Sequence, residues 1–213
     1  MLQRNAQRGF TLVEIAIVMV IIGLLLGGAL KGQEMIENAK VKSLLRFHDE
    51  VKAAYYSYQD IYRAYPGDDK KANRFDDVSD AQVGTGDGVV TGNWRSSGAA
   101  AESVLMWRHL ISAGLLGIPM PEASSQKWGL KAKIPTNIFG GVAGFEYNVD
   151  ELNLPVLCFN NLSEEQAVKI DLAADDGDLM AGTVFATDMA VQNTLKDLGK
   201  NYAQKNSALC FAF

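Results

Sequence analysis

Apolar residues form one uninterrupted run near the N-terminus, from Phe10 to Leu30, in which Glu14 is the only charged residue. As a helix this run would rise about 31 Å, which matches the hydrocarbon thickness of a membrane. Arg4 and Arg8 precede the run, and basic residues usually stay on the cytoplasmic side of a spanning helix. The pattern therefore predicts a membrane-spanning helix followed by an exported body.

Beyond the apolar run the pattern becomes amphipathic and keeps a helical period. Apolar, aromatic and histidine side chains recur at alternating spacings of three and four, on one face of a helix. These positions are Val41, Leu44, His48, Val51, Tyr55, Tyr58, Tyr62 and Tyr65. Pro66 and Gly67 follow, so the helix is predicted to end at Tyr65. We expect residues 10–30 to form the transmembrane half, and 31–65 the amphipathic half, of one helix.

The remaining residues, 66–213, show shorter elements that are typical of one globular body. A Gly- and Asp-rich surface loop is expected over 66–98, followed by an amphipathic helix over 99–113. Four strand-like runs predict an antiparallel sheet: 142–149, 154–160, 181–187 and 208–213. Ser163 and Gln166 have the spacing of a capping box that begins another helix. The expected fold class is α+β, with the long N-terminal helix packed on a C-terminal antiparallel sheet.

The net charge of the chain disfavours nucleic acid as a binding partner. The formal net charge is −5, and removal of the basic leader, residues 1–9, makes the rest more acidic. An acidic body argues against nucleic-acid binding, for which Lys127, Lys131 and Lys133 are the only modest basic group. We expect these lysines to be ordinary surface residues.

Two cysteines, Cys158 and Cys210, each lie in a predicted strand. If the body is extracytoplasmic, a disulfide is the leading interpretation, and closing a loop of about 50 residues would contribute about 4 kcal/mol. The alternative is a pair of buried free thiols. A zinc site is not expected, because His48 and His109 are distant in sequence and lack the spacing of a ligand pair.

Glu14 separates two interpretations of the N-terminal segment. An ordinary signal peptide also has a basic start and an apolar run, but a carboxylate inside the membrane costs about 2.5–3.5 kcal/mol on insertion scales. Cleavage after Gly9 would create an ammonium group on Phe10, one helical turn from Glu14. That ammonium could pair with Glu14 of the same chain or of a neighbouring helix. Cleavage would then permit assembly through charge neutralisation.

The sequence GFTLVE over residues 9–14, with its basic leader and long apolar run, resembles the processing site of type IV prepilins and type II secretion pseudopilins. The resemblance implies that prepilin peptidase cuts between Gly9 and Phe10 and then methylates Phe10. It also implies that Glu14 acts in subunit recruitment and registration. The chain differs from many pilins, which carry a helix-kinking proline after the apolar run, where this chain has Lys31.

This resemblance leads us to expect a non-enzymatic pilin, the structural subunit of a type IV pilus-like filament. The expected partners are copies of itself in a helical filament, prepilin peptidase, an inner-membrane assembly platform and, before assembly, the membrane. The precursor would lie in the bacterial inner membrane and the mature subunit in an extracellular pilus. Residues 158–210 correspond to the disulfide-bounded region that pilins commonly expose on the fibre surface, where any adhesive properties would lie.

Two other functions stay open. One is a type II secretion pseudopilin, which would remain periplasmic. Pseudopilin bodies are often smaller and cysteine-free, so the size of this body and its cysteines favour a pilin. The other is a membrane-anchored periplasmic binding protein or enzyme that uses residues 10–30 only as an anchor. No catalytic residues are predicted, because the sequence contains no nucleophile elbow.

One acidic group is a candidate metal site. Asp175, Asp176 and Asp178, beside Gly177, could supply oxygen ligands to calcium. Their spacing does not fit an EF-hand loop, and an Asx turn stabilised by its own side chains explains the same residues. No other metal and no cofactor is expected.

Overall fold

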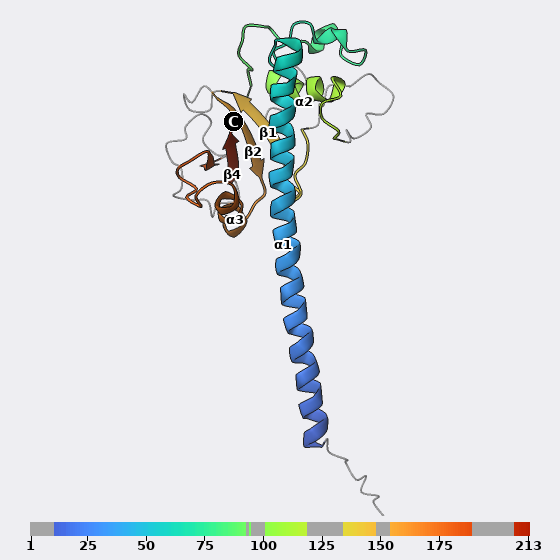
Figure 1. Cartoon of the computed structure of the whole chain (residues 1–213), viewed down its shortest axis with the longest axis vertical. Helices are drawn as coiled ribbons and strands as arrows, with labels where there is room; N and C mark the ends of the chain where they lie inside the picture. The colour runs from blue at the N-terminus through green and yellow to red at the C-terminus, as the bar shows by residue number, and fades with distance from the viewer. Residues whose placement is uncertain (1–10, 93, 95–100, 119–133, 148–153, 189–206) are drawn as a thin grey trace, which may run out of the picture. The chain divides into compact units, whose positions relative to one another are not determined.

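The computed structural model describes most of the chain. The described residues are 11–92, 94, 101–118, 134–147, 154–188 and 207–213. The chain divides into two compact units, Met1–Lys40 and Val41–Phe213. Helix α1 (Leu12–Tyr62) contributes to both units (Figure 1).

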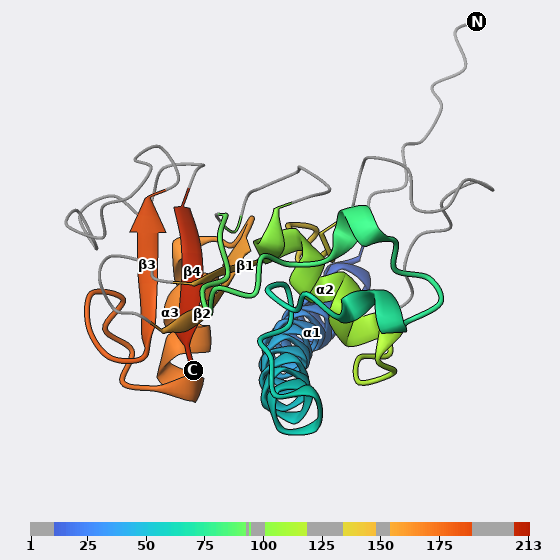
Figure 2. The same cartoon turned by 90° about the horizontal axis from the view of Figure 1, so that it is seen from above.

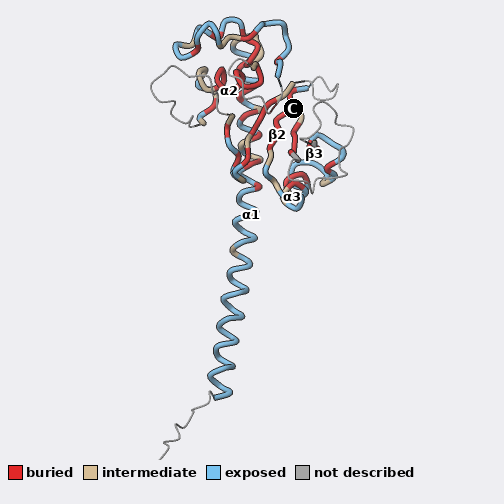
Figure 3. The backbone as a smooth tube through the Cα atoms, turned by 180° about the vertical axis from the view of Figure 1, so that it is seen from behind, coloured by how far each residue is buried: buried red, intermediate tan, exposed pale blue. Residues whose placement is uncertain are grey.

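Within the first unit, α1 is exposed on every side. None of the described residues from 11 to 40 is buried, and all but Gly32 and Glu37 are exposed, so this segment is almost entirely pale blue in Figure 3. The helix contains an 18-residue window with a mean hydropathy of 2.6, so its length and composition suffice to cross a membrane. Four glycines occur here, and a Cβ added to any of them would meet nothing within 4 Å: Gly23, Gly27, Gly28 and Gly32. An exposed apolar surface of this extent is typical of a membrane- or protein-interaction site.

Within the second unit, α1 presents the predicted apolar face to the body. Its buried residues are Val41, Leu44, His48, Val51, Ala54, Tyr55 and Tyr58. The helix ends at Tyr62, so the predicted end at Tyr65 is wrong by three residues. Arg63 adopts a φ of 54°, in the left-handed region, which stops the helical repeat even though its N–H still donates to the carbonyl of Gln59.

A four-stranded antiparallel sheet forms the C-terminal part of the body (Figure 2). Its strands are β1 (Ala143–Tyr147), β2 (Pro155–Asn160), β3 (Val184–Asp188) and β4 (Ser207–Ala212). The order across the sheet is β1-β2-β4-β3, so the last strand of the chain pairs between β2 and β3. The predicted α+β fold class, a long N-terminal helix with a C-terminal antiparallel sheet, is confirmed.

The two faces of the sheet build two separate hydrophobic clusters, because successive strand residues point to opposite sides. One face joins α1 and the other helices in the main core, with Phe145, Leu157, Phe159, Leu209 and Phe211. The opposite face forms a smaller cluster that contains Trp94, Val156, Cys158, Phe185 and Cys210. Gly144 lies directly beneath the backbone of Trp94, where a Cβ would collide with the Trp94 carbonyl. This close approach requires glycine.

Helix α2 (Glu102–Ser112) is buried from Glu102 to Leu110, more completely than the predicted amphipathic pattern implied. The reason is that it is contacted from several sides. Trp107 stacks on Phe47 of α1, and β1 also contacts the helix. The helix ends in a Schellman motif, with Gly114 at a φ of 70°.

Helix α3 (Glu164–Ala174) begins at the predicted capping box. The N–H of Gln166 donates to the hydroxyl of Ser163 at 3.2 Å, and the N–H of Ser163 donates to the side chain of Gln166 at 3.0 Å. Ala167 and Ile170 of this helix join the main core. The packing of α3 thus fixes the position of the acidic segment that follows it.

The Gly- and Asp-rich segment after α1 contains two short 3-10 helices, η1 (Ala72–Arg74) and η2 (Asp80–Gln82). The prediction of a surface loop is wrong for its first part, because Asp68 and Asp69 are each only 3 % exposed. Both carboxylates turn inward to accept hydrogen bonds, which the composition of the segment did not reveal.

Candidate functional site

The processing residues predicted from the sequence, Gly9 and Phe10, lie outside the described residues, as do the leader arginines. The structure begins at Thr11, which directly precedes α1. Lys127, Lys131 and Lys133 also lie outside the described residues.

Thr11 and Glu14 form a capping box at the start of α1. The backbone N–H and the hydroxyl of Thr11 both donate to Oε2 of Glu14 at 2.8 Å. In return, the N–H of Glu14 donates to the Thr11 hydroxyl oxygen at 3.3 Å. This reciprocal pairing satisfies backbone donors that a helix leaves open at its first turn.

The capping box determines how the Glu14 carboxylate can act. Oε2 takes both Thr11 donors, and within residues 11–92 no donor reaches Oε1. The carboxylate is therefore held at the helix N-terminus with one oxygen left to accept from another group. A cationic group such as an ammonium is a suitable partner for a carboxylate in apolar surroundings. The role of Glu14 in assembly stays a prediction.

Cys158 and Cys210 are joined by a disulfide bond. They stand directly opposite each other in the register of β2 and β4, and both are fully buried. The bond connects the end of the chain to the centre of the sheet and encloses α3 and β3. The region between the two cysteines is the one that the resemblance places on the surface of a filament.

The acidic group after α3 differs in membership from the predicted one. Asp171, Asp175 and Asp176 each offer an oxygen, and these atoms lie within 4.8 Å of one another. Asp178 is not part of this group, and its carboxylate accepts from the N–H of Met180 at 3.0 Å. Sequence reasoning missed Asp171, whose signal was an acidic residue on the apolar side of α3.

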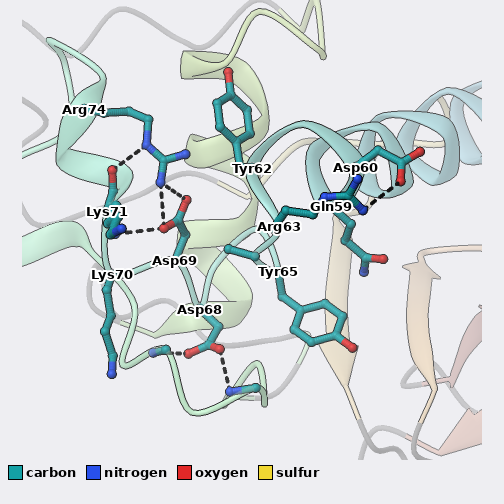
Figure 4. Close-up of a pocket in the computed structure, with 13 residues that line it drawn as sticks. Gln59, Asp60, Tyr62, Arg63, Tyr65, Asp68, Asp69, Lys70, Lys71 and Arg74 are labelled. Carbon is teal, nitrogen blue, oxygen red and sulfur yellow. Dashed lines mark hydrogen bonds and ion pairs between the residues drawn. The ribbon is translucent and has the colours of Figure 1, made fainter.

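A cleft of about 680 Å³ opens at the C-terminal end of α1 (Figure 4). Arg74 crosses it, donates from Nη2 to both oxygens of Asp69 at 2.8 and 2.9 Å, and lies over the ring of Tyr62 at 4.6 Å. Asp69 also accepts from the Tyr58 hydroxyl at 2.7 Å. Asp69 and Arg74 bind each other, and the bond from Tyr58 to Asp69 connects the segment after α1 to the helix.

Two further buried carboxylates organise the segment after α1, and sequence reasoning missed both. Asp68 accepts from the N–H groups of Gly86, Asp87 and Gly88 and from the hydroxyl of Thr85. Glu102 of α2 accepts from the N–H groups of Thr85 and Thr91 and from the hydroxyl of Thr91 at 2.7–2.8 Å. The glycines of GTGDG were the available signal, since glycine permits the backbone to approach an acceptor closely.

The pKa values of this region follow from burial and hydrogen bonding. Burial opposes ionisation of Glu102, but the hydrogen bonds from Thr91 and Thr85 bring its pKa below the usual value. Burial raises the pKa of Tyr58, and its hydrogen bond to Asp69 raises it further. Burial lowers the pKa of His109. These shifts belong to a structural network in which each group has a fixed partner.

Comparison with known proteins identifies the N-terminal segment. Residues 4–30 match the family described as the prokaryotic N-terminal methylation motif. No curated protein and no solved structure matches the chain. The match includes the predicted cleavage position and Glu14. Residues 4–30 therefore carry the class III signal motif that type IV pilins and pseudopilins share.

Proposed function

We propose that the mature chain is the structural subunit of a type IV pilus-like filament. Prepilin peptidase removes residues 1–9 and methylates the new N-terminus at Phe10. The subunit resides in the inner membrane before assembly, and the assembly platform then adds it to an extracellular filament made of copies of itself. Glu14 sets the register of the subunits by forming an ion pair with a Phe10 ammonium group.

One observation supports this proposal most strongly: the first unit exposes an apolar helix on every side and carries one acidic residue at its start. A membrane covers the apolar surface before assembly, but it offers no counter-charge to Glu14. Neighbouring copies of the same helix supply both an apolar cover and an ammonium group. A filament therefore satisfies both requirements of the segment.

The body favours a pilus subunit over a secretion pseudopilin. Its disulfide encloses residues 158–210, which include a helix and a strand, as in the surface region of many pilins. A plain membrane anchor would need neither the Glu14 carboxylate nor a cleavage site before Phe10. The buried carboxylates of Asp68, Asp69 and Glu102 are held by hydrogen bonds from the body itself, which supports a structural role over a catalytic one.

Substitution of Glu14 tests the assembly role directly. We expect Glu14→Ala to be exported and trimmed and to remain in the membrane. It should yield at least about tenfold fewer filaments, because its apolar helix lacks the carboxylate that pairs with the ammonium group. Glu50→Ala is the matched control, since Glu50 is an exposed acid in the second half of the same helix. Sheared filaments and trimmed precursor are both quantified by immunoblot. Normal filament yield from Glu14→Ala would overturn the proposal.

A further inference from the structure

Asp171 is a buried carboxylate with no hydrogen-bond partner among the described residues. Its exposed fraction is 0 %, and neither carboxylate oxygen receives a hydrogen bond. The amide of Gly177 influences its pKa but does not reach hydrogen-bonding geometry. By contrast, the other buried carboxylates of the described residues, Asp68, Asp69 and Glu102, each accept several hydrogen bonds. A buried ionisable group without a partner requires a physical explanation.

Two more carboxylates converge on Asp171 from the segment that follows α3. One oxygen each from Asp171, Asp175 and Asp176 lies within 4.8 Å of the others. The pKa of Asp171 rises to about 6, first through burial and then through the negative charges of Asp176 and Asp175. Asp175 and Asp176 are exposed to solvent, whereas Asp171 forms the buried floor of the group. When all three carboxylates are ionised they repel one another, and a cation among them would remove that repulsion.

Hydrogen bonds fix the two exposed carboxylates in place. Oδ2 of Asp175 accepts from the N–H and hydroxyl of Thr183 and from the N–H of Val184. Oδ1 of Asp176 accepts from the N–H of Asp178 at 2.8 Å. These bonds orient the carboxylates without using all their oxygens. The carboxylates of Asp175 and Asp176 are thus oriented by hydrogen bonds in the absence of an ion.

We propose that Asp171, Asp175 and Asp176 form a calcium site that fastens the end of α3 to the start of β3. Carboxylate oxygens select hard cations, and the absence of histidine and cysteine from this described group disfavours zinc. One oxygen from each carboxylate lies within 4.8 Å of the others, so a single divalent cation can contact all three. Calcium accepts flexible arrangements of oxygen ligands, whereas magnesium requires near-ideal octahedral geometry, which favours calcium for ligands drawn from a helix and the segment after it. Water would complete the coordination.

The site is tested on the full-length chain in detergent, which separates calcium binding from filament assembly. Bound metal is removed with a chelator, and calcium or magnesium chloride is then titrated by calorimetry and in thermal unfolding. We expect calcium to bind and to raise the unfolding midpoint by several degrees, with a clearly weaker response to magnesium. An equal response to both ions would overturn the assignment to calcium.

Asp171→Asn distinguishes a metal ligand from a structural acceptor. It should abolish the calcium-dependent rise in midpoint, and in chelator its own midpoint should equal or exceed that of the unchanged chain, because a buried charge has been removed. Glu164→Gln, at an exposed position of the same helix, should keep the full calcium response.

Asp176→Asn provides a second test if Asp171→Asn fails to fold, because Asp176 is exposed. It should weaken calcium binding at least about tenfold, since it removes one charged ligand. The absence of any calcium effect on the unchanged chain would overturn the proposal. A calcium response in the ligand variants equal to that of Glu164→Gln would overturn it as well.

Discussion

The backbone N–H of Gly67 donates to Nδ1 of His109 over 2.9 Å and joins the turn after α1 to the buried helix α2. Nε2 of the same ring lies 3.0 Å from the carbonyl of Gln82, so it carries the proton. The contact with Gly67 requires a neutral imidazole, because Nδ1 accepts only when it is unprotonated. Protonation of His109 would break the contact with Gly67.

This arrangement predicts that the body loses stability as the pH falls. Burial lowers the pKa of His109, and its charged neighbours are Asp69, Arg108 and Arg74. The unfolded chain therefore binds more protons than the folded chain once the pH falls through about 6.5. We expect this residue to reduce the free energy of unfolding by up to about 1.4 kcal/mol per pH unit between the unfolded and the folded pKa. Urea unfolding at about pH 7.5 and about pH 5.5 measures the effect.

His109→Asn is the control for this pH dependence, because it keeps a polar side chain but does not titrate. Asp171 and Glu146 act with the opposite sign, since their pKa values are raised, and His48 acts with the same sign as His109. These groups are common to both proteins, so the difference between the two isolates His109. If both proteins lost the same free energy on acidification, His109 would not be the responsible group.

The hydroxyl of Tyr58 should contribute measurably to the stability of the body. That hydroxyl donates to Oδ2 of Asp69 at 2.7 Å in a buried site. Tyr58→Phe would remove one donor from a buried carboxylate and should reduce the free energy of unfolding by about 1.5–3 kcal/mol. Tyr56→Phe is the matched control, because Tyr56 is 42 % exposed and its change should be within about 0.5 kcal/mol. Equal effects of the two substitutions in urea unfolding would contradict this account of the network.

The disulfide should be a large part of the stability of the body. It closes a separation of 52 residues, and both cysteines are fully buried. Replacing Cys158 and Cys210 together by alanine should reduce the free energy of unfolding by about 2–5 kcal/mol, because the unfolded chain gains conformational freedom. Urea unfolding compares the double variant with the unchanged chain under oxidising conditions. A loss below about 0.5 kcal/mol would show that strand packing alone holds β4 in place.

Hydrophobic periodicity was sufficient to predict the main architecture. The stripe from Val41 to Tyr58 indicated one buried helix face, and the structure buries it. Ser163 and Gln166 marked the start of α3 because a capping box depends on residues only three positions apart. The alternation of apolar residues indicated the strands, and Cys158 pairs with Cys210 because both occupy the same register of adjacent strands.

The features that the sequence did not reveal depend on contacts between distant segments. Asp68 is buried because backbone amides about 20 residues later surround its carboxylate, and no local pattern encodes that approach. The end of α1 depends on the backbone conformation of Arg63, which residue type does not specify. Asp171 was missed as a member of the acidic group because its burial follows from how α3 packs. At the N-terminus the reverse holds, since residues 9–14, with the basic leader before them and the apolar run after them, form a local pattern that predicts the processing site.

The central claim is that cleavage after Gly9 creates the ammonium group that Glu14 requires for assembly. Mass spectrometry of the chain in purified native filaments tests it most directly. Gly9→Leu serves as the control, and it should leave an uncleaved precursor in the membrane. We predict that filament subunits begin at Phe10 and carry one N-terminal methyl group. Filaments of normal yield whose subunits still begin at Met1 would contradict the account.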